Sequence, residues 1–150
     1  MKETSGNYND RTDIGDLTFE ILDHDRGYEL PPAPPEGEYP LPKWYRRVRN
    51  TRLKDLTVED ICRACRQEIY PEYVVPLALR LLHENPLTGE MYDGELIAAL
   101  GSIDIQYWRS QPAFREKLED ILQSARASAE SDIREDIERL LRRLDQARSR

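Results

Sequence analysis

The sequence predicts an all-α protein, a compact bundle of four to six helices that follows an extended, proline-rich N-terminal segment. From residue 45 onward, apolar residues recur every three or four positions, which is the spacing of one helix face. Charged residues make up 34% of the 150-residue chain, a share that suits helices with one face in solvent. Six prolines fall within residues 31–42, a density that excludes helix interiors and central strands. We therefore divide the chain into an acidic, proline-rich segment at residues 1–44 and a helical domain at residues 45–150.

The N-terminal segment holds most of the excess negative charge. The whole chain has a net charge of -7, and residues 1–44 contain four basic and ten acidic side chains, a net -6. Residues 1–16 are polar and are expected to form a mobile leader. Residues 17–22 alternate between apolar and polar, which fits either a short strand or the first turn of a helix. We expect residues 31–42 to be extended, as a linker or as a strap over the domain.

Two helices are predicted in the middle of the chain. Thr57 and Asp60 have the spacing of a capping box at the start of the first helix. Pro71 disfavours helical geometry in the residue before it, so this helix should end near Tyr70. Pro71 suits the first turn of the second helix, whereas Pro76 predicts a bend or a late start.

Further helices are predicted in the C-terminal half. One spans about residues 93–100 and is closed by Gly101. Residues 103–108 form a short hydrophobic connector. A long helical region begins at Ser110, and its apolar stripe thins over residues 125–131, which predicts a break or a lightly packed middle there.

Cys62 and Cys65 form a C-x-x-C pattern on the apolar stripe of a predicted helix. A redox pair needs a helix N-terminus that lowers a thiol pKa, and a zinc site needs two further ligands. The chain has only His24 and His83 to offer and no second cysteine pair. We therefore interpret the two cysteines as small hydrophobic core residues.

The sequence shows no pattern typical of an enzyme. It has no G-x-S-x-G, no glycine-rich phosphate loop and no H-E-x-x-H, and its carboxylate pairs lie on predicted solvent-exposed helix faces. We predict no catalytic residue, no metal ligand and no cofactor.

Residues 45–54 are the basic part of the chain and contain no acid before Asp55. One interpretation is a contact with RNA or DNA. The interpretation that we favour is a solvent-exposed helix face that pairs with the acidic N-terminal third, since the net charge of -7 opposes nucleic-acid binding. The basic residues are Arg46, Arg47, Arg49, Arg52 and Lys54.

Composition also predicts where the protein works. No apolar run approaches the roughly 18 residues that span a bilayer, so no membrane partner is expected. The polar N-terminus lacks the apolar stretch of a secretion signal, and two cysteines do not make a disulfide scaffold. We expect a cytoplasmic protein whose acidity suits a basic partner.

Residues 87–95 combine carboxylates with a methionine and a tyrosine. Met91 and Tyr92 lie among the acidic side chains of Glu90, Asp93 and Glu95. An acidic loop with an aromatic side chain on a helical frame is suited to a basic patch on a partner. Packing of Tyr92 back onto the core is the alternative, and the sequence favours neither.

The middle of the chain carries an ordered set of short motifs, namely Leu53–Asp60, Arg66-Gln67, Tyr73–Leu79, Asn85–Leu96 and Trp108. This order resembles the immunity proteins of bacterial contact-dependent growth inhibition systems. In that family an L-x-x-L-T-x-E-D start is followed by an R-Q pair, a Y-L-V-P-L-A-L helix and an N-P-L…Y-x-G-D-L loop, and a tryptophan commonly comes next. The resemblance covers about residues 45–108, with Glu95 in place of the expected aspartate, and does not account for the charged region beyond Phe114.

The resemblance implies a protein that binds and neutralises the toxic C-terminal domain of an effector delivered by a neighbouring cell. Many such toxins are nucleases with basic grooves, so occlusion of a basic surface is the expected mechanism. The predicted contact residues are Glu84, Glu90, Tyr92, Asp93 and Glu95, with the acidic N-terminal stretch as the alternative.

Overall fold

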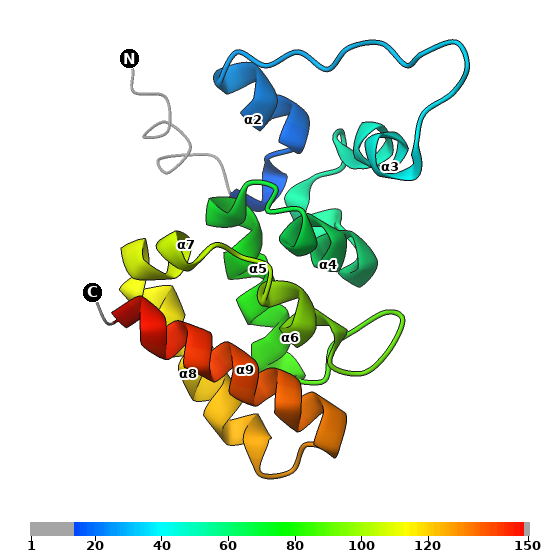
Figure 1. Ribbon diagram of the computed structural model, residues 1–150. Coiled ribbons are helices and arrows are strands. Elements are labelled where there is room, and N and C mark those ends of the chain that lie inside the picture. The colour runs from blue at the N-terminus through cyan, green and yellow to red at the C-terminus, as the bar shows by residue number, and fades with distance from the viewer. Residues whose placement is uncertain (1–13, 149–150) are drawn as a thin grey trace. The chain divides into compact units, whose positions relative to one another are not determined.

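The computed structural model describes residues 14–148, which form eight α-helices, two short 3-10 helices and no strand (Figure 1). The prediction of an all-α protein is confirmed. The described part of the chain has more helices than the predicted four to six because segments expected to be extended also form short helices. The elements are η1 (Ile14–Asp16), α2 (Phe19–Asp25), α3 (Pro40–Val48), η2 (Leu53–Asp55), α4 (Val58–Arg66), α5 (Pro71–Glu84), α6 (Glu95–Leu100), α7 (Ile105–Ser110), α8 (Pro112–Arg126) and α9 (Ser131–Arg148).

The chain forms two compact units, which divide between Leu56 and Thr57. The first contains α2 and α3, joined by the proline-rich segment, and the second contains α4 to α9. The predicted mobile leader falls mainly on residues 1–13, which lie outside the described residues.

In the first unit, residues 19–25 form helix α2, so the helical alternative for this segment is correct and the strand is not. Thr18 caps this helix by accepting a hydrogen bond from the amide of Ile21 (3.1 Å), and the Phe19 ring stacks on that of Tyr45 at 5.6 Å. The expectation that residues 31–42 are extended is wrong at its end, because α3 begins at Pro40. A proline is tolerated in the first turn of a helix, where no intrahelical partner awaits its missing N–H.

In the second unit, the predicted capping box of α4 is confirmed. The hydroxyl of Thr57 accepts from the amide of Asp60 (3.1 Å), and the Asp60 carboxylate accepts from the amide of Thr57 (3.2 Å). The helix ends at Arg66, earlier than the predicted Tyr70. Glu68 and Tyr70 both take left-handed backbone angles, with φ of 53° and 44°, and so reverse the chain before α5. Helix α5 begins at Pro71 and continues through Pro76, so the late start does not occur.

The C-terminal half differs from the prediction at one element. The expected connector at residues 103–108 contains helix α7, which Asp104 caps by accepting from the amide of Gln106 (2.8 Å). The predicted break at residues 125–131 is confirmed, because α8 ends at Arg126 and α9 begins at Ser131. The Arg134 side chain donates to the carbonyl oxygen of Ala129 (2.9 Å) and so fixes this turn.

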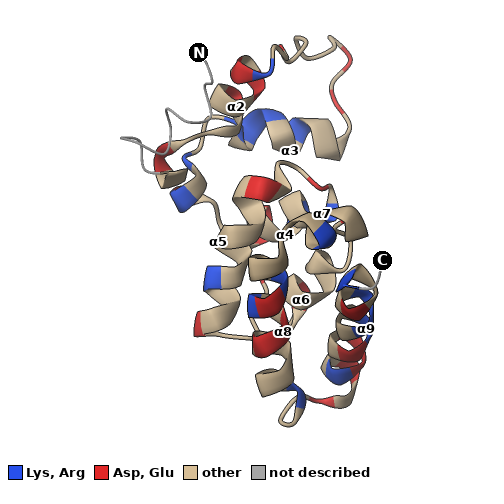
Figure 2. Cartoon of the chain, turned by 90° about the vertical axis from the view of Figure 1, so that its left-hand side faces the viewer, with Lys and Arg blue, Asp and Glu red and all other residues tan. Residues whose placement is uncertain are grey.

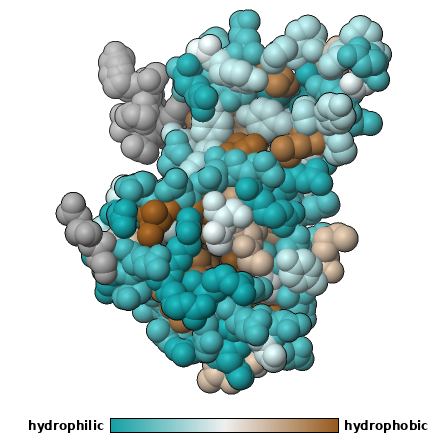
Figure 3. All heavy atoms as spheres, in the orientation of Figure 1, coloured by the Kyte–Doolittle hydropathy of each residue, from teal (hydrophilic) through white to brown (hydrophobic). Residues whose placement is uncertain are grey.

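The core of the second unit is built by α9 as much as by the earlier helices. Helix α4 packs on α5 and α6, and α9 packs along α6, α7 and α8 (Figure 1). The outward face of α9 is covered by hydrophilic side chains (Figure 3), as expected of an amphipathic surface helix. Its inner face is buried through Ile137, Leu140, Leu144 and Ala147. Among the described residues, none of the helices combines the length and apolar character that crossing a bilayer requires.

Candidate functional site

The predicted contact residues lie in or beside the loop at residues 85–94, which joins α5 to α6. Glu84 ends α5 and is exposed, and Glu90 and Asp93 are exposed within the loop. Tyr92 is 55% exposed, so it does not pack back onto the core, and the neighbouring Met91 is 74% exposed. Four of the five predicted residues are therefore exposed and lie in or beside this one loop of the second unit.

Glu95, the fifth predicted residue, lies inside the protein. It is the first residue of α6 and only 2% of its surface is exposed. One carboxylate oxygen accepts hydrogen bonds from the amides of Glu90 and Met91, each at 2.9 Å. The other oxygen accepts from the Arg66 side chain of α4 at 3.2 Å. Glu95 thus contributes by holding the loop in shape, and its own carboxylate is occupied.

The electrostatics at Glu95 favour the charged form. Burial alone would raise the pKa of this carboxyl group, because a charge is poorly solvated there. The amides of Met91 and Glu90, together with the Arg66 guanidinium, outweigh that effect and hold the pKa below its ordinary value of 4.5. At neutral pH, Glu95 is therefore a permanently charged acceptor at the centre of the loop.

The loop is rigid for further reasons. The amide of Gly94 donates to the Leu87 carbonyl (2.9 Å), and the Asn85 side chain accepts from the amide of Leu87 (3.0 Å). Gly89 has no room for a side chain, because a Cβ there would lie 2.0 Å from the carbonyl oxygen of Tyr92. A loop that is already ordered loses little conformational entropy when a partner binds.

A groove of about 400 Å³ lies beside the loop. Leu87 and Asp93 line it from the loop, and Ala129, Glu130 and Ile133 line it from the turn between α8 and α9 and from the start of α9. The last three residues were not predicted from the sequence. The predicted break near residue 130 was the available signal, but nothing in the sequence places this turn against the loop.

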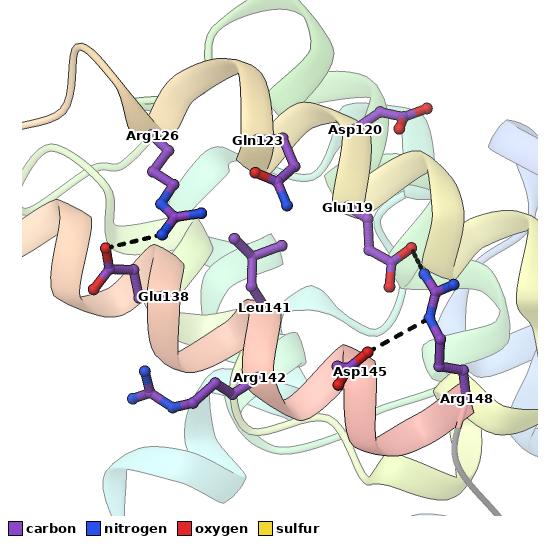
Figure 4. A pocket seen from close by; sticks show the side chains of 9 residues that line it. All are labelled: Glu119, Asp120, Gln123, Arg126, Glu138, Leu141, Arg142, Asp145 and Arg148. Atoms are coloured by element: carbon purple, nitrogen blue, oxygen red, sulfur yellow. Dashed lines mark hydrogen bonds and ion pairs between the residues drawn. The ribbon is translucent and has the colours of Figure 1, made fainter.

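A second cavity, of about 550 Å³, lies between α8 and α9 and is lined mainly by charged side chains (Figure 4). Most of these charges are satisfied within the protein. Arg126 pairs with Glu138 at 3.5 Å, and Arg148 pairs with both Glu119 and Asp145 (Figure 4). These ion pairs join the two helices, so we interpret this cavity as a polar seam between them.

The interpretation of the two cysteines as core residues is confirmed. Cys62 and Cys65 are free thiols, and both are buried in α4. Burial raises the pKa of each thiol to about 12, which is opposite to what a redox cysteine needs. Within residues 14–148, no group of three His, Cys, Asp or Glu side chains is placed to hold a metal ion.

The basic segment pairs with the acidic N-terminal third, as predicted. Arg46 binds Glu38 at 2.8 Å, and Arg49 binds the buried carboxylate of Asp23 at 3.2 Å. Lys54 binds Asp16 at 2.8 Å. Figure 2 shows the basic positions of α3, which are Lys43, Arg46 and Arg47, and Arg49 directly follows this helix. Because the charges of Arg46, Arg49 and Lys54 are compensated within the first unit, the segment has less positive potential to offer a nucleic acid than its sequence suggests.

A rigid acidic loop with exposed apolar side chains is typical of proteins that bind other macromolecules. Comparison with known families agrees: the family model described as CDI immunity proteins matches residues 28–118, more than half of the chain. The chain belongs to this family, and the resemblance noted in the sequence is confirmed. The match includes α3 to α7 and ends within α8, so all of α9 lies outside it. The comparison with curated proteins found no significant match to the chain.

Proposed function

We propose that this protein binds the toxic C-terminal domain of a contact-dependent growth inhibition effector through the surface formed by Glu84, Glu90, Met91, Tyr92 and Asp93. Family membership supports a toxin-neutralising immunity protein. The observation that carries the proposed surface is the loop held from within by Glu95, which presents Met91 and Tyr92 at 74% and 55% exposure. Apolar and aromatic side chains on a fixed backbone are the kind of anchor that dominates binding energy.

The carboxylates around these anchors define the partner. Glu84, Glu90 and Asp93 are exposed and make no ion pair within residues 14–148. Their potential attracts a positively charged surface and speeds the encounter. A basic, nuclease-like toxin domain fits this surface, and its neutralisation follows from occlusion of that basic face. The protein works in the cytoplasm without catalysis and without a cofactor.

Co-expression with candidate toxin domains tests this proposal. Cells that make the toxin domain should grow only when the immunity protein is present. Tyr92→Ala should weaken toxin binding by tenfold or more, about 1.4 kcal/mol, and reduce protection. Tyr39→Ala is the matched control, because Tyr39 is 84% exposed and lies in the first unit.

Two outcomes would contradict the proposed surface. If Tyr92→Ala and a Glu90→Lys, Asp93→Lys double variant both bind the toxin as tightly as the parent, the loop is not the interface. If Tyr39→Ala alone removes protection, the acidic N-terminal segment is the interface instead. If the protein protects cells against none of the toxin domains encoded next to its own gene, the proposed function itself is wrong.

A further inference from the structure

The groove beside the loop has two walls of different origin. Pro86, Leu87 and Asp93 come from the loop, inside the segment that matches the family. Ala129, Glu130 and Ile133 come from the α8–α9 turn and the start of α9, outside that segment. The groove therefore exists only because the region beyond the match folds back against the loop.

The two walls are held in fixed register. Gly94 has φ of 84°, and a Cβ at this position would lie 3.1 Å from a side-chain carbon of Ile133. The loop backbone thus approaches α9 closely, at a residue that only glycine fits well. Arg134 donates to the carbonyls of Ala129 and Arg126, at 2.9 and 3.3 Å, and holds the other wall. The groove is therefore formed before any partner arrives.

The groove is apolar inside, and its exposed rim is polar, with Asn85, Ser124 and Ser128 beside two carboxylates. Ala125 and Ala129 are buried, and Pro86 and Ile133 are half-buried, so the deeper lining is hydrocarbon. Asp93 on one wall and Glu130 on the other are exposed, and neither makes an ion pair in the described part of the chain. An apolar side chain bound in the groove would displace water from these two carboxylates without offering hydrogen-bond donors in its place, which costs free energy.

An arginine side chain fits both features. Its hydrocarbon stem covers apolar surface while its head stays at a polar edge. The planar guanidinium offers five donors in a fixed fork, so it can engage carboxylates on both walls. A groove of about 400 Å³ leaves ample room for one such side chain.

We propose that this groove receives an arginine side chain of the toxin domain, with its stem on Leu87 and Ile133 and its guanidinium between Asp93 and Glu130. The inference rests on the proposed function, because the arginine belongs to that partner. It adds a selectivity element: one carboxylate comes from the family frame, and the other comes from the region outside the match.

Titration of the isotope-labelled full chain with N-acetyl-argininamide tests the groove without a toxin. We expect backbone NMR signals of residues 87–94 and 129–133 to shift at about 150 mM salt. The neutral, nearly isosteric N-acetyl-citrullinamide should bind at least fivefold more weakly. Asp93→Asn and Glu130→Gln should each weaken the argininamide about fivefold, as loss of one partly exposed ion pair predicts. Glu135→Gln is the control, because Glu135 is also exposed on α9 but does not line the groove.

The titration separates failure of the groove from failure of the proposed function. Equal binding of argininamide and citrullinamide, shifts spread over every acidic surface, or no shift at all would overturn the groove proposal. Changes of the same signals on dilution without the probe would assign the groove to a second copy of the chain and overturn it too. Growth protection is measured separately with Tyr92→Ala, so it can hold or fail independently of the groove.

Discussion

Replacement of Glu95 by alanine should disorder the acidic loop while leaving its surface chemistry in place. The carboxylate accepts from two backbone amides at 2.9 Å and from Arg66 at 3.2 Å. Each amide left without an acceptor costs about 1–3 kcal/mol, and the pair with the partly exposed Arg66 adds less than about 1 kcal/mol. We expect a loss of about 3 kcal/mol in the free energy of unfolding. At about 2–4 °C per kcal/mol for a chain of this size, Tm falls by roughly 6–12 °C.

Unfolding of the second unit can be measured separately from unfolding of the first. That unit contains Trp108, and the first contains Trp44. In a Trp44→Phe background, Trp108 fluorescence during urea unfolding reports on α4 to α9. Hydrogen exchange at the amides of Glu90 and Met91 should accelerate in Glu95→Ala. The control is Glu90→Gln, which removes an exposed carboxylate and should change stability by less than about 0.5 kcal/mol.

Acid should act on the same group. The folded pKa of Glu95 lies below its ordinary value of 4.5, so its stabilising effect is complete above about pH 4.5 and is lost as pH falls through the folded value. Glu95→Gln keeps an acceptor for the amides but should remove this part of the pH dependence. If Glu95→Ala melts like the parent with both amides still protected from exchange, other contacts hold the loop and Glu95 does not have this role.

Two further predictions concern the frame of the protein. Asp23→Asn should destabilise the first unit by about 2–3 kcal/mol. It replaces by a neutral amide the buried carboxylate that accepts from Tyr45 (2.9 Å) and pairs with Arg49 (3.2 Å). Faster hydrogen exchange in α2 and α3, absent from the exposed control Asp25→Asn, would show this, and equal exchange in both variants would contradict it. Cys62 and Cys65, with thiol pKa values of about 12, should resist a thiol reagent at pH 8 until the chain unfolds. Rapid reaction of the native protein would show that α4 opens.

The parts of the fold that were predicted from the sequence depend on local signals. Thr57 and Asp60 form reciprocal hydrogen bonds between side chain and backbone amide within one helical turn. The break before Ser131 follows from the thinning of the apolar stripe. The N-cap residue Asp104 offered a similar local signal for α7, but the hydrophobic run after it was interpreted as a connector.

The parts that were missed depend on contacts distant in sequence. The end of α4 is set by left-handed Glu68, whose carboxylate accepts from the amide of Asp104 at 2.7 Å. The burial of Glu95 depends on Arg66, which lies on another helix. A carboxylate in an acidic loop gives no sign in the sequence that it faces inward, so Glu95 was grouped with its exposed neighbours.

The region outside the family match has two structural consequences that belong together. Helix α9 buries Leu140 and Leu144 in the core of the second unit, so it is a structural part of that unit. Its first turn also places Ile133 against Gly94. Because one helix both completes the core and builds a wall of the groove, a change at its buried face would alter the groove at the same time. The helices inside the family match can therefore support a groove that extends beyond that match. This is possible because α9, which forms one wall of the groove, is anchored in the core.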